Sequence, residues 1–417
     1  MLARRATLLG TETAFEVLAK AKALEAGGKG VVHLEIGEPD FPTPPHIVEA
    51  ACQALREGYT HYGPTPGLPE LREAVAAHIS RSRAIPVSAE QVVVTPGAKP
   101  ILFFTLLALV QRGDAVHYPD PGFPIYESVV RFCGGRPVPI RLLEEKGYHP
   151  DLGGLAASIT PRSRLIILNS PHNPTGAVLS REELETIARI VLRQKGLYVL
   201  SDEVYSEMTI ASLPGMAERT ILVDGFSKTY AMTGWRLGYG VFPRWLVPAI
   251  VRLAVNSVSC AATFSQRAAL AALEGPQEPV QAMVAEFRRR RDALVEGLGR
   301  LPGLRCPRRG PSTPSPASGA RGLPATSLRP GPWRPGWSSS RAGPSVGEAR
   351  GISASPTRPP WRRSRGPWGD CRRCSTPWPP RRGGLSPPAG GLRALFFRKG
   401  VWGKPVSSEE TGFPHSR

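Results

Sequence analysis

The most restrictive feature of the sequence is a repeated unit. In it, a short and mostly apolar run ends in a polar turn, usually with glycine or proline, and longer helical patterns alternate with these runs. The unit recurs in EQVVVTPGAKP, DAVHYPDPGFP, SRLIILNSPHNPTG, GLYVLSDEVY and RTILVDGFSK. Runs such as LIIL do not alternate apolar and polar residues, which is typical of parallel strands covered on both faces. The pattern therefore predicts an α/β fold with a mostly parallel central sheet and helices on both faces.

Chemically active side chains follow the ends of four of these apolar runs. They are Lys99, Asn173, Asp202 and Lys228. In open α/β sheets, ligands bind beyond the carboxyl ends of the strands. We therefore expect these four side chains to converge on one site.

The residue types at these positions fit one cofactor, although singly Lys228 could be a surface lysine and Asp202 a helix N-cap. An amine in an apolar, glycine-rich turn can form a Schiff base with a carbonyl group. A carboxylate directly after a buried strand can accept a hydrogen bond from a protonated ring nitrogen. The turn TPGAK opens a helix, and its backbone amides together with Arg236 suit a phosphate. The combination predicts binding of pyridoxal 5′-phosphate.

Residues 31–306 resemble the class I/II aminotransferases, the fold-type I pyridoxal-phosphate enzymes similar to aspartate aminotransferase. The motifs that carry the resemblance are IGEPDF, YGPTPGLPELREA, NSPHNPTG, SDEVY and GFSKTYAMTGWRLGY, in the family's order and at its spacing. The resemblance implies that Lys228 is the Schiff-base lysine and proton shuttle, and that Asp202 pairs with the pyridine nitrogen.

Further roles are implied by the resemblance alone. They are contacts of Tyr205 and Asn173 with the ring's 3′ oxygen, stacking of Phe123 on the ring, phosphate binding by Ala98, Lys99 and Arg236, a reach of Tyr62 to the phosphate of a neighbouring subunit, and substrate contacts of Gly37 and Asn173. Gly225 departs from family members that place a phosphate-binding serine there. No metal ligands are expected.

The family's domain division, carried onto this chain, places an N-terminal segment of the small domain at 1–36. The large cofactor-binding domain then covers 37–280, and the first helix of a C-terminal small domain covers 281–306. The residues themselves predict a short strand, a proline-rich loop and a helix within 31–58, and a long amphipathic helix at 282–301. The four arginines at 288–291 could be a nucleic-acid patch, but the solvated face of a helix is the favoured interpretation.

The chain changes character after Cys306. Residues 307–417 hold 20 of the 45 prolines and 6 of the 8 tryptophans, and they carry +16 of the net charge of +19. This proline-, arginine-, glycine- and serine-rich composition predicts disorder and cannot build a packed core. Because the first 306 residues carry only +3, we expect neither a nucleic-acid partner nor a membrane.

The genetic code offers an explanation for this tail. Joining the third base of each tail codon to the first two bases of the next permits Gly-Ala-Phe-Tyr-Ala-Phe-Pro from residues 309–316, close to a strand of the family's small domain. Two further stretches in the same frame permit the next expected strand and the segment with the family's carboxylate-binding arginine. We infer a single-base loss near the codon for Cys306, or an equivalent sequencing error, although a natural disordered tail is the alternative.

The sequence thus predicts an aminotransferase that moves an amino group between an amino acid and a 2-oxo acid, impaired in this chain by loss of the small domain. Two alternatives stay open: a pyridoxal-phosphate-dependent β-lyase of the same fold, and a non-catalytic binding protein with a basic tail. The expected assembly is a homodimer. The cysteines up to Cys306 show no disulfide framework and no signal peptide is visible, so the expected location is the cytoplasm.

Overall fold

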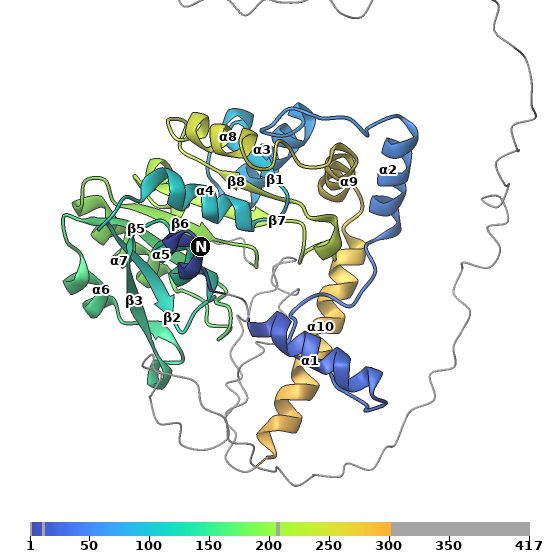
Figure 1. Ribbon diagram of the computed structural model, residues 1–417, viewed down its shortest axis with the longest axis horizontal. Helices are drawn as coiled ribbons and strands as arrows, with labels where there is room; N and C mark the ends of the chain where they lie inside the picture. The colour runs from blue at the N-terminus through green and yellow to red at the C-terminus, as the bar shows by residue number, and fades with distance from the viewer. Residues whose placement is uncertain (1, 11–12, 206–208, 302–417) are drawn as a thin grey trace, which may run out of the picture. The chain divides into compact units, whose positions relative to one another are not determined.

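The computed structural model describes residues 2–10, 13–205 and 209–301, which all belong to one compact unit of the chain. Its central element is a sheet of eight strands in the order β1-β8-β7-β6-β5-β2-β3-β4 (Figure 1). The strands are β1 (Val92–Thr95), β2 (Ala115–Asp120), β3 (Arg136–Leu143), β4 (His149–Pro150), β5 (Ser163–Asn169), β6 (Tyr198–Asp202), β7 (Thr220–Gly225) and β8 (Gly238–Val241).

Five of the strands run parallel, which confirms the predicted fold class. They are β3, β2, β5, β6 and β7. Strand β8 runs antiparallel to β7 and to β1, and β4 runs antiparallel to β3. In the register of the sheet, Asn169 lies opposite Asp202, and Asp202 lies opposite Val223. The polar ends of three neighbouring strands are therefore side by side.

Helices cover both faces of the sheet because its strands are apolar on both sides. Leu165 and Ile167 of β5 pack with α4 (Lys99–Leu109), α5 (Ile125–Phe132) and α8 (Val247–Val255). The alternate residues Ile166 and Leu168 pack with α6 (Leu152–Ser158) and α7 (Arg181–Arg193). The continuous apolar run LIIL is thus divided between two layers, as parallel strands require.

A third cluster covers β1, β7 and β8. It joins Val92, Val94 and Leu222 to α2 (Pro45–Arg56), α3 (Pro69–Arg83), α9 (Thr263–Glu274) and the start of α10 (Glu278–Gly299). The remaining helices are α1 (Thr13–Ala26) and the 3-10 turns η1 (Arg4–Leu8), η2 (Ala89–Gln91), η3 (Glu144–Lys146), η4 (Ile210–Ser212), η5 (Ala217–Arg219) and η6 (Thr233–Trp235). Within the described ranges, no helix is both long enough and apolar enough to cross a membrane.

The short strand predicted near residue 31 is wrong. Residues 31–36 pair with no described strand, and Val32 and Leu34 are 85% and 57% exposed. A β-branched run becomes a strand only where a neighbouring strand and a packed surface receive it. The helix predicted in 31–58 is confirmed as α2, and the helix predicted at 282–301 is confirmed within α10. The domain division stays a prediction, and the tail from 307 to 417 lies outside the described residues.

Candidate active site

Asp202 is the last residue of β6. One oxygen of its carboxylate is hydrogen-bonded and the other is not. The Tyr126 hydroxyl, from α5, donates a hydrogen bond of 2.7 Å to Asp202 Oδ2. The other oxygen, Oδ1, is buried and has no hydrogen-bond partner within the described part of the chain. Burial raises the pKa of Asp202, and the Tyr126 hydroxyl and the backbone amide of Val204 lower it. A buried carboxylate oxygen without a donor is costly unless a ligand supplies one.

The loop after β5 is tied to the end of β6 by one asparagine. Asn169 Nδ2 donates to the carbonyl of Asp202 at 3.1 Å, and Asn169 Oδ1 accepts from the backbone N–H of Asn173 at 2.7 Å. Tyr205 lies close enough to Asp202 for the two to interact electrostatically, and burial raises the pKa of Tyr205 to about 12. The structure therefore places Asn173 and Tyr205 in the turns that flank Asp202.

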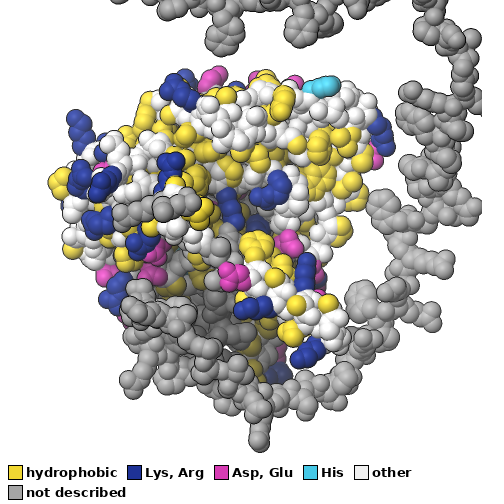
Figure 2. All heavy atoms as spheres, viewed as in Figure 1, with side chains coloured by type: hydrophobic (Ala, Val, Ile, Leu, Met, Phe, Trp, Pro, Cys, Tyr) yellow, Lys and Arg dark blue, Asp and Glu magenta, His cyan; other side chains and the backbone are white. Residues whose placement is uncertain are grey.

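Lys228 follows β7 in a half-buried turn. Its Nζ donates a hydrogen bond to the carbonyl oxygen of Gly37. Burial lowers the pKa of Lys228, and the nearby positive charges of Lys99 and Arg236 lower it further, whereas Glu38 raises it. Lys99 and Arg236 thus lie near enough to Lys228 to interact electrostatically with it, and a dianionic phosphate would neutralise such a cluster of cations. Figure 2 shows Lys and Arg side chains gathered near the centre of one face of the molecule.

The turn between β1 and α4 lies against Arg236, and its positive φ at residue 97 needs glycine. Gly97 has φ +85°, and a Cβ built there would lie 2.5 Å from Arg236 Nη2. Gly238, at the start of β8, is equally restricted, because its Cβ would lie 2.5 Å from the backbone nitrogen of Ala98. Both glycines let the guanidinium and the start of α4 share one small space. Arg236 thus lies against Gly97, the residue before Ala98, and the phosphate-binding roles of Ala98 and Arg236 stay predictions.

Phe123 contacts both Tyr126, which bonds to Asp202, and the cationic Lys99. Its ring centroid is 5.7 Å from that of Tyr126, in an edge-to-face arrangement, and Lys99 Nζ is 5.6 Å from the ring centroid. An aromatic ring at this position can stack on a planar ligand that reaches from Asp202 to Arg236.

The loop that carries Gly37 is fastened to the segment after Lys228. Glu38 accepts from the hydroxyl of Thr233 at 2.9 Å, and the Thr43 hydroxyl donates to the carbonyl of Ala231 at 2.7 Å. These bonds join the predicted substrate-contacting loop to the predicted cofactor-binding segment.

Tyr62 takes no part in this cluster. Its side chain is 89% exposed. Sequence reasoning did not identify two residues that hold the site. Tyr126 bonds to Asp202, and Asn169 ties the loop after β5 to the end of β6. Asn169 stands inside NSPHNPTG, so the motif contained it. Tyr126 lies three residues after the predicted ring-stacking Phe123, but nothing in the sequence connected it with Asp202, 76 residues away.

Comparison with known proteins decides the family. The family model described as aminotransferase class I and II matches residues 29–310. An aspartate aminotransferase of Musicola paradisiaca is 39% identical over 314 residues, which is 73% of this chain and 78% of that protein. The chain belongs to the class I and II aminotransferases. This family depends on pyridoxal phosphate. The chain is therefore a pyridoxal-phosphate-dependent aminotransferase by lineage.

Other relatives of this aminotransferase carry different names. An arginine–pyruvate transaminase of Pseudomonas aeruginosa is 41% identical over 299 residues, covering 70% of this chain and 76% of that protein. The structure of Thermus thermophilus aspartate aminotransferase with maleate matches with a TM-score of 0.69 and 39% identity, over 72% of this chain and 80% of that one. The fold and the family are therefore shown, whereas the relatives' names differ in substrate.

Proposed function

We propose that this chain binds pyridoxal 5′-phosphate on Lys228 and transfers an amino group between an amino acid and a 2-oxo acid. The observation that carries the proposal is the buried Asp202 Oδ1 without a donor, at the same sheet edge as the half-buried Lys228. The protonated ring nitrogen of the cofactor is the donor that Oδ1 lacks. The phosphate would lie with Arg236, Lys99 and the amides that begin α4.

When bound, the cofactor supplies a carbonyl group that takes up the substrate's nitrogen and a ring that stores the electrons released at Cα. The chain's own residues do the rest. Asp202 holds a proton on the ring nitrogen, and Asn173 and Tyr205 are placed to contact the ring's 3′ oxygen. Lys228, whose pKa is lowered by burial, takes and returns the proton at Cα more readily than an ordinary lysine. Gly37, adjacent to Lys228 Nζ, is placed to contact the substrate carboxylate.

The proposal includes a homodimer in the cytoplasm. Tyr62 supports the dimer, because an 89% exposed tyrosine in a matching family motif is free to reach a neighbouring subunit's phosphate. The donor amino acid stays open, since part of the substrate pocket belongs to the small domain that the tail replaces.

Borohydride reduction of the chain after incubation with the cofactor tests the lysine. We expect the pyridoxyl group on Lys228, found by peptide mass spectrometry. Recovery of the label on the exposed Lys99, or on Lys195, would refute the assignment. A second experiment separates the two enzyme classes: with an amino acid, transamination yields pyridoxamine phosphate, whereas a β-lyase yields pyruvate and ammonia.

A further inference from the structure

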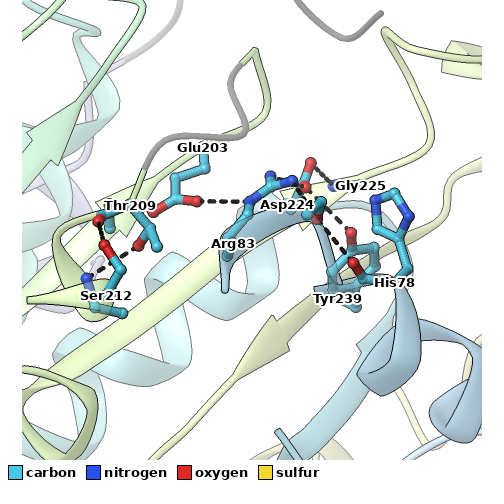
Figure 3. Close-up of polar contacts among 11 residues, drawn as sticks. His78, Arg83, Glu203, Thr209, Ser212, Asp224, Gly225 and Tyr239 are labelled. Carbon is cyan, nitrogen blue, oxygen red and sulfur yellow. Dashed lines mark hydrogen bonds and ion pairs between the residues drawn. The ribbon is translucent and has the colours of Figure 1, made fainter. Parts of the chain in front are cut away.

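A buried ion-pair network lies directly behind the proposed site. Arg83, the last residue of α3, has a side chain that is 1% exposed. Its Nε donates to Glu203 Oε2 at 3.2 Å, and its Nη2 donates to Asp224 Oδ2 at 2.9 Å. Figure 3 shows the guanidinium between the two carboxylates. One arginine therefore bridges two neighbouring strands that are 21 residues apart in sequence.

Each carboxylate in this network is also bonded on its other side. Ser201 donates to Glu203 Oε1 at 2.7 Å. Asp224 Oδ1 accepts from the backbone N–H of Gly225 at 2.7 Å, and Asp224 Oδ2 also accepts from the Tyr239 hydroxyl at 3.1 Å. Both carboxylates therefore have their orientation fixed from two directions.

The positions of the two acids in the chain connect this network to the reaction. Glu203 follows Asp202 directly, and its backbone N–H donates to the carbonyl of Val223 at 2.8 Å. Asp224 precedes Gly225, the last residue of β7, and the turn that contains Lys228 follows. Arg83 is thus bonded to the residue that follows Asp202, the proposed partner of the ring nitrogen. It is also bonded to the residue four positions before Lys228, the proposed Schiff-base lysine.

We propose that Arg83 is a positioning residue for Asp202 and Lys228, acting through Glu203 and Asp224. Burying an arginine away from water has a large desolvation cost. Two ion pairs, one at each strand, offset that cost more fully than a single ion pair does. Burial raises the pKa of Glu203 to about 7 and that of Asp224 to about 6, with Arg83 acting against both shifts. The inference rests on the proposed roles of Asp202 and Lys228. Arg83 lies outside the five motifs that carry the resemblance to the family.

The first experiment measures amide hydrogen exchange in the full chain without cofactor. The variants are Arg83→Lys, which keeps the charge but cannot keep both branches of the fork, Glu203→Gln and Asp224→Asn. Arg81→Lys, on the exposed face of the same last turn of α3, is the matched control. We expect each of the three network variants to speed exchange at least fivefold in both segments 202–205 and 225–228, with β2 and β3 unchanged. Equal acceleration throughout the sheet, or none in one of the two segments, would overturn the proposal.

The second experiment measures the cofactor. In variants that remain folded by circular dichroism, we expect the dissociation constant for pyridoxal 5′-phosphate to rise at least tenfold, and Arg81→Lys to leave it unchanged. Unchanged affinity in folded network variants would show that Arg83 only stabilises the fold. If the parent chain itself binds no cofactor, the proposed function fails for this chain, and the exchange experiment still decides the role of Arg83.

Discussion

Replacing Tyr126 by phenylalanine tests how Asp202 is held, because it removes only one hydroxyl. The ring contact with Phe123 at 5.7 Å is kept, and the 2.7 Å hydrogen bond to Asp202 Oδ2 is lost. Oδ1 is already without a donor, so the backbone amide of Val204 would be the remaining group that favours the ionised form of this buried carboxylate. A hydrogen bond to a charged group contributes about 1.5–3 kcal/mol, so the loss of this one should raise the pKa of Asp202 further.

The sign of the effect with pH follows from this bond. Tyr126 stabilises the ionised form of Asp202, whose pKa burial already raises. The loss of unfolding free energy in Tyr126→Phe should therefore be small at low pH, where the carboxyl is protonated, and should grow as the pH rises. Urea unfolding at a series of pH values measures this difference. The dissociation constant for pyridoxal 5′-phosphate, measured at neutral pH, should rise by up to about 100-fold.

Tyr198→Phe is the control for this experiment. Tyr198 lies on the same strand as Asp202, and its ring packs against Trp245 with centroids 5.4 Å apart. We expect this variant to keep the parent's cofactor affinity and pH dependence. The reasoning is refuted if Tyr126→Phe and Tyr198→Phe behave alike, or if the stability loss in Tyr126→Phe does not change with pH.

Three further predictions follow. Glu203→Gln should flatten part of the pH dependence of stability. Burial raises the pKa of Glu203 from 4.5 to about 7, so the native chain binds a proton that the unfolded chain releases, and the parent's stability falls as the pH rises from about 4.5 to about 7. Urea midpoints of variant and parent that change with pH in parallel would contradict this. Arg290→Met should loosen the loop near Gly37, because Arg290 pairs with Asp40 at 2.8 Å and lies 4.9 Å from the centroid of the Phe41 ring. Amide hydrogen exchange of residues 37–43 should become faster. In the control Arg291→Met, whose partner is the adjacent Asp292, that exchange should be unchanged. The chain as written should show negligible transamination, and insertion of one base near the codon for Cys306 should restore it in an assay of amino acids with 2-oxoglutarate; equal activity of both forms would show that the tail does the work of the small domain.

The arginine run in α10 illustrates how local sequence leaves function open. Four consecutive arginines suggested either a polyanion surface or a solvated helix face. In the structure Arg289 and Arg290 pair with Glu286, Arg290 also pairs with Asp40, and Arg291 pairs with Asp292. Acidic side chains thus neutralise most of the run, and one member is drawn into an aromatic contact that only the packing of α10 against the loop could create.

The sequence alone determined the fold class and most of the proposed site, because these depend on short-range patterns. Apolar runs fix which segments are strands, parallel strands bring their carboxyl ends to one edge, and the motifs fall at those ends. Lys228, Asp202, Asn173 and Arg236 could therefore be named from the residues, whereas Tyr205 was named through the resemblance to the family. Local pattern misled only where a segment needed a partner to become a strand, as at residues 31–36.

The tertiary structure decided which groups hold these residues in place. Tyr126 reaches Asp202 across 76 residues, and Arg83 reaches Glu203 and Asp224 across 120 and 141 residues. No periodicity or motif encodes such contacts, because they arise from the angle at which a helix packs on a sheet and from the burial that makes an unpaired charge costly. The residue types of the proposed site could thus be named from the sequence, whereas the bonds that hold them required the structure, in which Tyr126 of α5 bonds to Asp202 and Arg83 of α3 bonds to Glu203 and Asp224.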